Sequence, residues 1–359
     1  FHPDIVAESE LEWHDALAPE QRALQLGSDT HPAFTYRGTD ALREPSRRVW
    51  GHEWPNPING SNMASPSAVF RAMADGDPYA VKAFFTLGNN TLMSFANMQL
   101  IHRALMNQDL VVAFEQFRTP TAQLADYILP GDAWLERNCL SDGFGWTAIY
   151  RPSQKVVEPP GECRGAFDFW RDLACRMGFE SHFPWPTNEA LLDHRLARLG
   201  LSFDEFADKH PYHMRALAYR KYEQTGFATP SGKVELHSSV LADLGLDPLP
   251  YWRDAPASGP QFPLTLFMGV REDEFFQTGH RHISALRARN PQPQVYLSPG
   301  DAQRLRLGED EWSWVETQHG RIRLKVAIRP DMPDGIVRVP HGWWLPERAE
   351  GDGSLSGAW

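Results

Sequence analysis

The stretch that decides the fold, residues 80–136, reads AVKAFFTLGNNTLMSFANMQLIHRALMNQDLVVAFEQFRTPTAQLADYILPGDAWLE. It contains three short apolar runs, Val81–Leu87, Leu110–Phe114 and Tyr127–Leu129. Their length and continuous apolar character are typical of strands that are buried on both faces of a parallel sheet. The stretch therefore predicts three strands of an α/β domain.

A helical pattern lies between the first two apolar runs. Met98, Ile101 and Leu105 fall on one face of this helix, and either Ser94 or Asn97 can serve as its N-cap. The order strand, helix, strand predicts a βαβ unit with a right-handed crossover.

The turn Gly88-Asn89-Asn90 follows the first of these strands. In open α/β sheets ligands bind outside the carboxyl ends of the strands, and a turn of Gly and Asn exposes backbone N–H groups there. The same three residues are also ordinary turn chemistry. The turn alone favours a plain connection over a ligand site.

Length and charge narrow the classes of function. A chain of 359 residues predicts two or three domains with a sizeable core. Its formal net charge of −11 argues against a nucleic-acid partner, because such a partner requires a basic face. An anionic ligand must then be held by a local basic cluster.

Cysteines and apolar runs exclude further classes. Cys139, Cys163 and Cys175 are too few and too irregularly spaced for a zinc or iron–sulfur site or a disulfide framework. We find no P-loop, metal-spaced His pair or Ser-His-Asp constellation. No apolar run approaches the roughly 20 residues that span a membrane. The chain opens at Phe1 without a signal peptide and is expected to begin within a longer protein, so its compartment, bacterial cytoplasm or periplasm, stays open.

Changes in composition predict the domain organisation. We expect residues 1–64 to form an irregular connecting segment with one helix near Ala18–Leu26, and residues 65–248 to form the α/β domain. The Pro-rich residues 246–261 predict a linker, and the short strands and turns of residues 262–359 predict a β-barrel.

Within the α/β domain we expect helices over residues 65–76, 167–179 and 187–209, and a short strand at Lys233–Leu236 after the turn TPSG. For the barrel we expect strands at 262–269, 294–299 and 335–340, with a helix at 301–307. A hairpin over residues 311–328 should turn at His319-Gly320.

The best ligand candidate from the residues is the segment 269–290, GVREDEFFQTGHRHISALRARN, which concentrates arginine and histidine in an acidic chain. The planar fork of an arginine such as Arg271 suits a diphosphate, and Gln277, Thr278 and the N–H of Gly279 can donate to its oxygens. A solvated basic loop is the alternative. His341 and Trp343 form a second candidate, for which a packed core is the alternative.

The chain resembles the molybdopterin oxidoreductase family, whose members commonly carry a strand, GxNP, a helix, a second strand and FxTxTAxxADxxLPxxxWLE. The matching residues are Gly88, Asn90, Phe117, Thr119, Thr121, Ala122, Ala125, Asp126, Leu129, Pro130, Trp134, Leu135 and Glu136. The departures are Thr91 in place of proline and Glu115 where aspartate is frequent. Residues 225–238, TGFATPSGKVELHS, and the order DAxxLxLxxG to PHGW in residues 301–343 also resemble the family.

The resemblance implies a Rossmann-like α/β domain followed by a truncated double-psi β-barrel. It also implies a bis(molybdopterin guanine dinucleotide) cofactor with molybdenum or tungsten. The implied cofactor-binding residues are Gly88, Asn89, Asn90, Glu115, Thr119, Arg271, Gln277, Thr278, Gly279, His280, His341 and Trp343. The family's metal ligand and a [4Fe-4S] cluster belong to an upstream region, so we expect no metal ligand in this chain and leave its catalytic residues unassigned.

The resemblance further implies oxygen-atom or electron-pair transfer on a small-molecule substrate, with an iron–sulfur electron-transfer subunit as partner. The sequence pattern from GDPYAVKA at residue 76 to TPSGKVEL is most similar to that of the thiosulfate or polysulfide reductase-like branch. Two alternatives stay open: a non-redox, acetylene hydratase-like enzyme on the same cofactor, and a non-catalytic relative in a respiratory complex.

Overall fold

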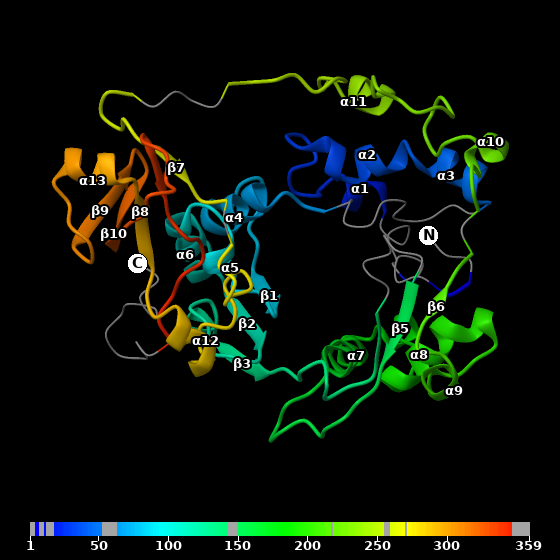
Figure 1. Cartoon of the computed structure of the whole chain (residues 1–359). Coiled ribbons are helices and arrows are strands. Elements are labelled where there is room, and N and C mark those ends of the chain that lie inside the picture. The colour runs from blue at the N-terminus through cyan, green and yellow to red at the C-terminus, as the bar shows by residue number, and fades with distance from the viewer. Residues whose placement is uncertain are drawn as a thin grey trace. The chain divides into compact units, whose positions relative to one another are not determined.

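The computed structural model describes residues 4–6, 11, 18–51, 63–141, 149–216, 218–254, 259–269 and 271–346. The chain divides into two compact units, each of which combines two stretches of sequence (Figure 1). The first unit comprises residues 1–82 and 129–251, and the second comprises residues 83–128 and 252–359. The boundaries that the sequence suggests at 64, 248 and 262 stay a prediction.

The βαβ prediction is confirmed in the second unit. Strand β1 (Ala83–Leu87) runs parallel to β2 (Leu110–Glu115), and β3 (Tyr127–Pro130) follows on the other side of β2. Two helices, α5 (Thr91–Ser94) and α6 (Met98–Met106), connect β1 to β2. Strand β2 buries four successive side chains, as expected for a strand that is covered on both faces.

Helix α6 begins at Asn97, which settles the choice between the two predicted N-caps. Asn97 has φ 63°, and its side chain accepts a hydrogen bond from the Leu100 N–H at 3.2 Å. Asparagine tolerates this left-handed conformation better than most residues, and its oxygen satisfies one of the free N–H groups of the first turn. Ile101, Ala104 and Leu105 form the buried face.

The C-terminal part of the second unit is a mixed five-stranded sheet. Its strands are β7 (Thr265–Phe267), β8 (Gln294–Leu297), β9 (Trp312–Thr317), β10 (Gly320–Ile328) and β11 (Ile336–Arg338), in the order β7-β11-β8-β10-β9. Strands β8 and β10 pair in parallel, whereas β9 and β10 form the predicted antiparallel hairpin. The hairpin turns at Gln318-His319, one residue before the predicted position, because Thr317 pairs with Gly320.

The core of this sheet consists of alternating apolar residues from three strands. Val295, Leu297, Leu324, Val326, Val337 and Val339 are all buried in one cluster. Two helices accompany the sheet, α12 (Ser284–Arg289) and α13 (Pro299–Leu305), the latter starting two residues before the predicted 301 with Ser298 as N-cap. The predicted order of strand, helix, hairpin and strand is confirmed.

The first unit contains an antiparallel sheet that the sequence did not suggest. Its strands are β4 (Cys139–Ser141), β5 (Ile149–Ser153) and β6 (His213–Met214). They pack with Ile5 and with helices α8 (Asn188–Leu196) and α9 (Phe203–Lys209) around one buried cluster. The predicted single helix over 187–209 is therefore wrong, since the chain turns at Gly200 with φ 67°.

Other helices of this unit match their predicted places. They are α4 (Pro66–Asp75), which ends at Gly76 as expected, and α7 (Ala166–Arg176). The remaining short helices among the described residues of this unit are α1 (Pro19–Arg22), η3 (Pro32–Phe34), α2 (Tyr36–Asp40), α3 (Arg43–Trp50), η6 (Glu180–His182), η7 (Ala197–Leu199), α10 (Tyr222–Thr225) and α11 (Ser239–Asp243). A further short helix, η4 (Ala122–Leu124), lies in the second unit.

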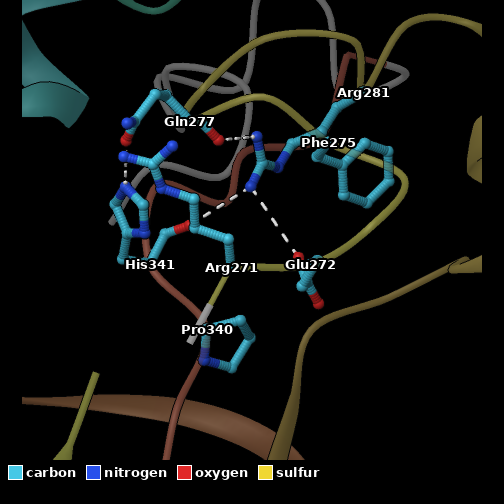
Figure 2. Close-up of a pocket in the computed structure, with 7 residues that line it drawn as sticks. All are labelled: Arg271, Glu272, Phe275, Gln277, Arg281, Pro340 and His341. Atoms are coloured by element: carbon cyan, nitrogen blue, oxygen red, sulfur yellow. Dashed lines mark hydrogen bonds and ion pairs between the residues drawn. The ribbon is translucent and has the colours of Figure 1, made fainter. Parts of the chain in front are cut away.

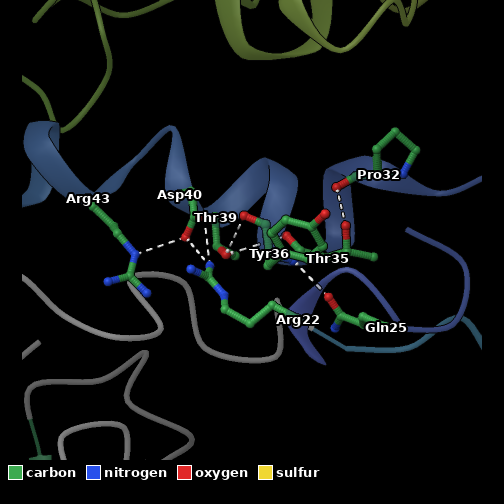
Figure 3. Close-up of polar contacts among 8 residues, drawn as sticks. All are labelled: Arg22, Gln25, Pro32, Thr35, Tyr36, Thr39, Asp40 and Arg43. Carbon is green, nitrogen blue, oxygen red and sulfur yellow. Dashed lines mark hydrogen bonds and ion pairs between the residues drawn. The ribbon is translucent and has the colours of Figure 1, made fainter. Parts of the chain in front are cut away.

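Residues 36–50, which we expected to be irregular, form helices α2 and α3. Asp40 accepts hydrogen bonds from Arg22 at 2.6 Å and from Arg43 at 2.9 Å (Figure 3). Gly38 is required here because a Cβ would lie only 2.3 Å from the carbonyl oxygen of Ala33. These contacts stabilise helices too short to form alone, and the sequence pattern of such short helices is weak.

The predicted strand at Lys233–Leu236 is also wrong, because none of these residues pairs with a strand. The carboxylate of Glu235 instead accepts N–H bonds from Ser231 and Ser239, at 3.1 and 2.9 Å, and so fixes the turn and the start of α11. Bonds from Ser231 and Ser239 lower the pKa of Glu235 to about 2. The stretch is a hydrogen-bonded connection.

Candidate cofactor site

A backbone hydrogen bond fixes the turn after β1, and the space beside Gly88 is empty. The Gly88 N–H donates to the Phe114 carbonyl at 2.9 Å, which fastens the turn to the end of β2. Gly88 has φ 56°, and a Cβ at this position would meet no atom within 4 Å. Conformation therefore favours glycine here, and the space above the turn is open at the carboxyl end of the sheet.

Asn90 is buried directly behind this turn and is only 5% exposed. Its Oδ1 accepts hydrogen bonds from the hydroxyl and the N–H of Thr121, at 2.8 and 3.3 Å. The Thr121 hydroxyl in turn accepts from the Leu92 N–H at 2.9 Å. Within the part of the chain that the structure describes, the buried Nδ2 of Asn90 has no partner. It is a donor without an acceptor, which is rare in a folded protein.

Glu115 ends β2 beside the same turn. Burial raises the pKa of its carboxyl to about 7, although N–H bonds from Gln116 and Asn89 act in the opposite direction. The carboxyl therefore changes charge near neutral pH, close to the open turn.

Thr119 is buried nearby, where its hydroxyl accepts from the Ala122 N–H at 3.2 Å and starts η4. Because a hydroxyl can accept and donate at once, Thr119 keeps a proton to donate. The structure thus brings together Gly88, Asn89, Asn90, Glu115 and Thr119, as predicted.

Three of the predicted residues, Arg271, Gln277 and His341, line a pocket at the 271–281 segment. Arg271, Glu272, Phe275, Gln277, Arg281, Pro340 and His341 form its walls (Figure 2). Gln277 and His341 hydrogen-bond to each other at 3.0 Å; with Gln277 Oε1 as acceptor, His341 donates through Nε2. Arg271 is exposed and its guanidinium lies 6.0 Å from the Phe276 ring, so it can reach a ligand in the pocket.

Arg281 occupies the centre of this group, although its side chain is only 1% exposed. One of its nitrogens, Nη1, donates to the Gln277 carbonyl at 2.6 Å and the Gly279 carbonyl at 3.3 Å, and Nη2 donates to the His341 carbonyl at 3.1 Å. Burial lowers the pKa of Arg281 to about 10, and Glu272 opposes this effect. The guanidinium therefore stays charged at neutral pH.

Glu272 balances this buried charge. Its Oε2 lies 3.9 Å from Arg281 Nη2 and accepts from the Trp343 indole N–H at 2.7 Å. Its Oε1 accepts from Asn290 at 2.8 Å. The Trp343 ring also packs edge-on against Phe275, and Trp344 donates to the Thr278 carbonyl at 2.7 Å. Trp343 is thus a packed residue whose N–H already has an acceptor.

The backbone of the pocket is unusual in three places. Gln277 and His280 have φ 53° and 71°, a region that non-glycine residues seldom adopt. Gly342 has φ 71°, and a Cβ there would lie 2.9 Å from the methyl group of Thr278. Residues that are held in this way cluster at functional sites.

One contact connects the two groups within the second unit. The Phe117 ring stacks on His282 with 3.5 Å between ring centroids. Phe117 follows β2 and His282 follows the pocket segment. Burial, and then His280, lower the pKa of His282, so this ring is neutral at neutral pH. The predicted site residues therefore belong to one compact unit.

Sequence reasoning did not select three of the residues that build the site, namely Arg281, Glu272 and Thr121. Charged residues are seldom fully buried, so a sequence gives no reason to place an Arg–Glu pair inside a pocket wall. Thr121 belongs to the family pattern, and that pattern was the one available signal.

The described residues contain neither a membrane-spanning helix nor a cluster of metal ligands. No described helix has both the length and the apolar character needed to cross a membrane. No cluster of His, Cys, Asp or Glu in the described ranges is arranged to hold a metal ion.

Two family models match this chain. The molybdopterin oxidoreductase model matches residues 58–176, and the molydopterin dinucleotide binding domain model matches residues 265–356. Between them they include both groups of site residues.

Individual relatives agree with these matches. The chain is 46% identical to acetylene hydratase of Syntrophotalea acetylenica over 365 aligned residues, which cover 99% of this chain and 50% of that protein. The structure of acetylene hydratase from Pelobacter acetylenicus superposes with a TM-score of 0.94 over the same shares. The thiosulfate reductase subunit PhsA of Salmonella typhimurium is 29% identical over 72% of this chain and 38% of its own length. The chain thus spans about half the length, or less, of these relatives, and the predicted fold class is confirmed.

Proposed function

The chain belongs to the molybdopterin oxidoreductase family, and from that premise we propose that its second unit binds bis(molybdopterin guanine dinucleotide) in a longer enzyme. The observation that carries the proposal is the grouping of the two ligand segments, residues 88–119 and 271–343, in one unit with Phe117 stacked on His282. A dinucleotide cofactor has two ends, so it needs two separated groups of donors.

The residues present fit such a cofactor. Asn90 offers a buried Nδ2 without an acceptor, and Gly88 leaves the space beside it open. Arg271 lines the pocket with an exposed guanidinium, which matches the geometry of a diphosphate. Backbone and side-chain donors of residues 277–280 can bind the remaining oxygens.

The bound cofactor would supply a molybdenum or tungsten centre for oxygen-atom transfer, electron-pair transfer or hydration of the substrate. This chain's residues would bind and orient that cofactor. The Gln277–His341 pair would hold a defined proton on His341 Nε2 and present the amide NH₂ of Gln277 as a donor. The metal ligand and a [4Fe-4S] cluster are proposed for other parts of the full-length protein.

Acid hydrolysis of the purified full-length protein tests this proposal. It should release GMP at about two molecules per metal atom, because the proposed cofactor has two molybdopterin guanine dinucleotides per metal and each contains one guanine nucleotide. A metal-loaded protein that releases no GMP would overturn the proposal.

The type of reaction is a second proposal. An identity of 46% over 99% of the chain favours hydration of a small unsaturated substrate such as acetylene, ahead of the thiosulfate reductase-like reaction that the sequence pattern favoured. Hydration needs no electron carrier, whereas the reductase reading requires an iron–sulfur partner subunit.

The two reactions are separable with the full-length protein. Incubation with acetylene in the absence of an electron donor should form acetaldehyde, since the addition of one water balances this reaction. Release of sulfide from thiosulfate with a reduced dye, without hydration, would instead support the redox reading.

A further inference from the structure

Arg281 makes contacts that the binding of a cofactor does not by itself explain. Three backbone carbonyls, those of Gln277, Gly279 and His341, converge on its guanidinium at 2.6 to 3.3 Å. Carbonyl oxygens that point at one another repel, so this arrangement depends on the positive charge between them. Figure 2 shows the bonds from Arg281 to the Gln277 and His341 carbonyls, and its ion pair with Glu272, as dashed lines.

Two of these carbonyls belong to a strained segment. Gln277 and His280, which flank Thr278 and Gly279, each have positive φ. Such a conformation costs free energy for a residue with a side chain and persists only where other contacts impose it. The bonds from Arg281 Nη1 to the Gln277 and Gly279 carbonyls are those contacts.

The third carbonyl connects the opposite wall of the pocket. His341 lies 60 residues away from Arg281 in the sequence, and its side chain bonds to Gln277 at 3.0 Å. The guanidinium lies 4.8 Å from the Phe275 ring centroid and 5.0 Å from that of Trp343. Arg281 therefore lies beside two aromatic rings that pack on each other, while it joins two chain segments.

Glu272 completes the arrangement from the other side. It lies beside Arg281 and receives bonds from Trp343 and Asn290, so one carboxylate joins three segments. A lone buried charge would be costly, and the pair reduces that cost. We call Arg281 and Glu272 the buried clasp.

We propose that Arg281, with Glu272 as its counter-ion, is a positioning residue that holds the side chains of Gln277 and His341 in place for the cofactor. This inference rests on the proposed function of the site. Arg281 acts through Gln277 and His341, because both terminal nitrogens of its guanidinium already bond to protein oxygens. Arg271, exposed in the same pocket, is the arginine available to the ligand.

The test uses full-length holoenzyme with Arg281→Met, Arg281→Lys and the control Arg289→Ala. Arg289 belongs to the same segment, but its side chain is 71% exposed. After prolonged buffer exchange, Arg281→Met should retain cofactor, measured as GMP, about tenfold less well than wild type, as expected when a charge-assisted contact is lost. Arg281→Lys should lie in between, because lysine keeps the charge but lacks the planar fork, and Arg289→Ala should match wild type.

A double variant separates positioning from direct binding. If Arg281 acts through His341, combining Arg281→Met with His341→Ala should lower retention no further than the stronger single variant does. If the losses of cofactor retention in the two single variants multiply in the double variant, Arg281 does not act through His341, and the positioning role is overturned. An Arg281→Met or Arg281→Lys protein that has a lower melting temperature but full retention would also overturn it.

Hydrogen exchange of the cofactor-free full-length protein tests the clasp independently of the proposed function. Amides of residues 277–280 and 341–344 should exchange faster in both Arg281 variants, whereas those of α13 should not change. Unchanged exchange at 277–280 in Arg281→Lys, or in Arg281→Met if it folds, would overturn the clasp. If wild type releases no GMP, the proposed function fails, and the exchange result still decides the clasp.

Discussion

The turn after β1 and the 271–281 segment both line the candidate cofactor site, but different interactions hold them. Short hydrogen bonds fix the turn: the Gly88 N–H donates to the Phe114 carbonyl, and the Thr121 hydroxyl donates to Asn90 Oδ1. Long charged and aromatic side chains fix the second segment, since Arg281 reaches His341 and Glu272 reaches Trp343. The turn is thus a property of the sheet, whereas the pocket exists only when two distant segments meet.

The largest expected effect tests the rigidity of the turn. Asn90→Ala removes the acceptor of two Thr121 bonds, and leaving two buried donors unsatisfied costs about 2–5 kcal/mol in the free energy of unfolding. Chemical denaturation should report this loss.

The control for this variant is Asn97→Ala, which removes an exposed cap and should cost about 1 kcal/mol. Asn90→Asp keeps the acceptor for Thr121 and removes the Nδ2 donor. It should therefore keep most of the stability while weakening cofactor retention. Equal stability of Asn90→Ala and wild type would show that the turn does not depend on this network.

The next effect concerns the ligand side of the pocket. Arg271→Ala should reduce cofactor affinity by about 1.5–3 kcal/mol, roughly ten- to a hundredfold, because it removes a charge-assisted bond to an anion. The metal content of purified protein measures this loss, and the loaded fraction should turn over normally. Full occupancy with collapsed activity per metal would instead place Arg271 at the substrate.

A smaller effect compares two glycines of the second unit. Gly335 and Gly342 have φ 85° and 71°, but only Gly342 has a close neighbour, the Thr278 methyl group at 2.9 Å. Gly335→Ala should cost about 1–2 kcal/mol from backbone strain alone. Gly342→Ala should cost more and also lower cofactor retention, because it separates the two pocket walls. Identical losses of stability for both variants would show that the close approach of Thr278 to Gly342 has no effect.

The last effect is a pH dependence at the turn. The folded protein keeps the proton of Glu115 up to about pH 7, whereas the unfolded chain loses it near 4.5. Within that window the folded state binds more protons, so stability falls as pH rises. Glu115→Gln cannot ionise and should remove this fall, seen as a higher melting temperature above pH 7 and little change below pH 4.5.

The control for the pH experiment has the opposite sign. Bonds from Ser202 lower the pKa of Glu205, so Glu205 contributes stability above its ordinary pKa of 4.5 and loses it as pH falls. Glu205→Gln should therefore lower the melting temperature at neutral pH. A Glu115→Gln protein that behaves like Glu205→Gln would contradict the buried state of Glu115.

The same contrast explains what could be predicted from the sequence. The strands β1 and β2 and the turn between β1 and α5 follow from local apolar runs and turn residues, and they were predicted correctly. The sheet of β4, β5 and β6 could not be predicted, since its strands are short and β4 (Cys139–Ser141) lies far along the sequence from β6 (His213–Met214). Helices α2 and α3 and the connection at Lys233–Leu236 depend on contacts of Asp40 and Glu235 that no local pattern indicates.

For the site, the family pattern supplied the residues that we propose as contacts of the cofactor. The residues that support them, Arg281 and Glu272, were missed because burial of a charged pair depends on the tertiary structure. Thr121 shows the intermediate case, since its place in the pattern was visible while its bonds to Asn90 were not.

We propose that one cofactor contacts both the turn and the pocket, and hydrogen exchange of loaded and cofactor-free full-length protein can decide this. Loading should slow the exchange of amides at residues 88–92 and at residues 277–281 together, and should leave the β9–β10 hairpin unchanged. Protection of only one of the two segments, or of neither, would contradict the claim.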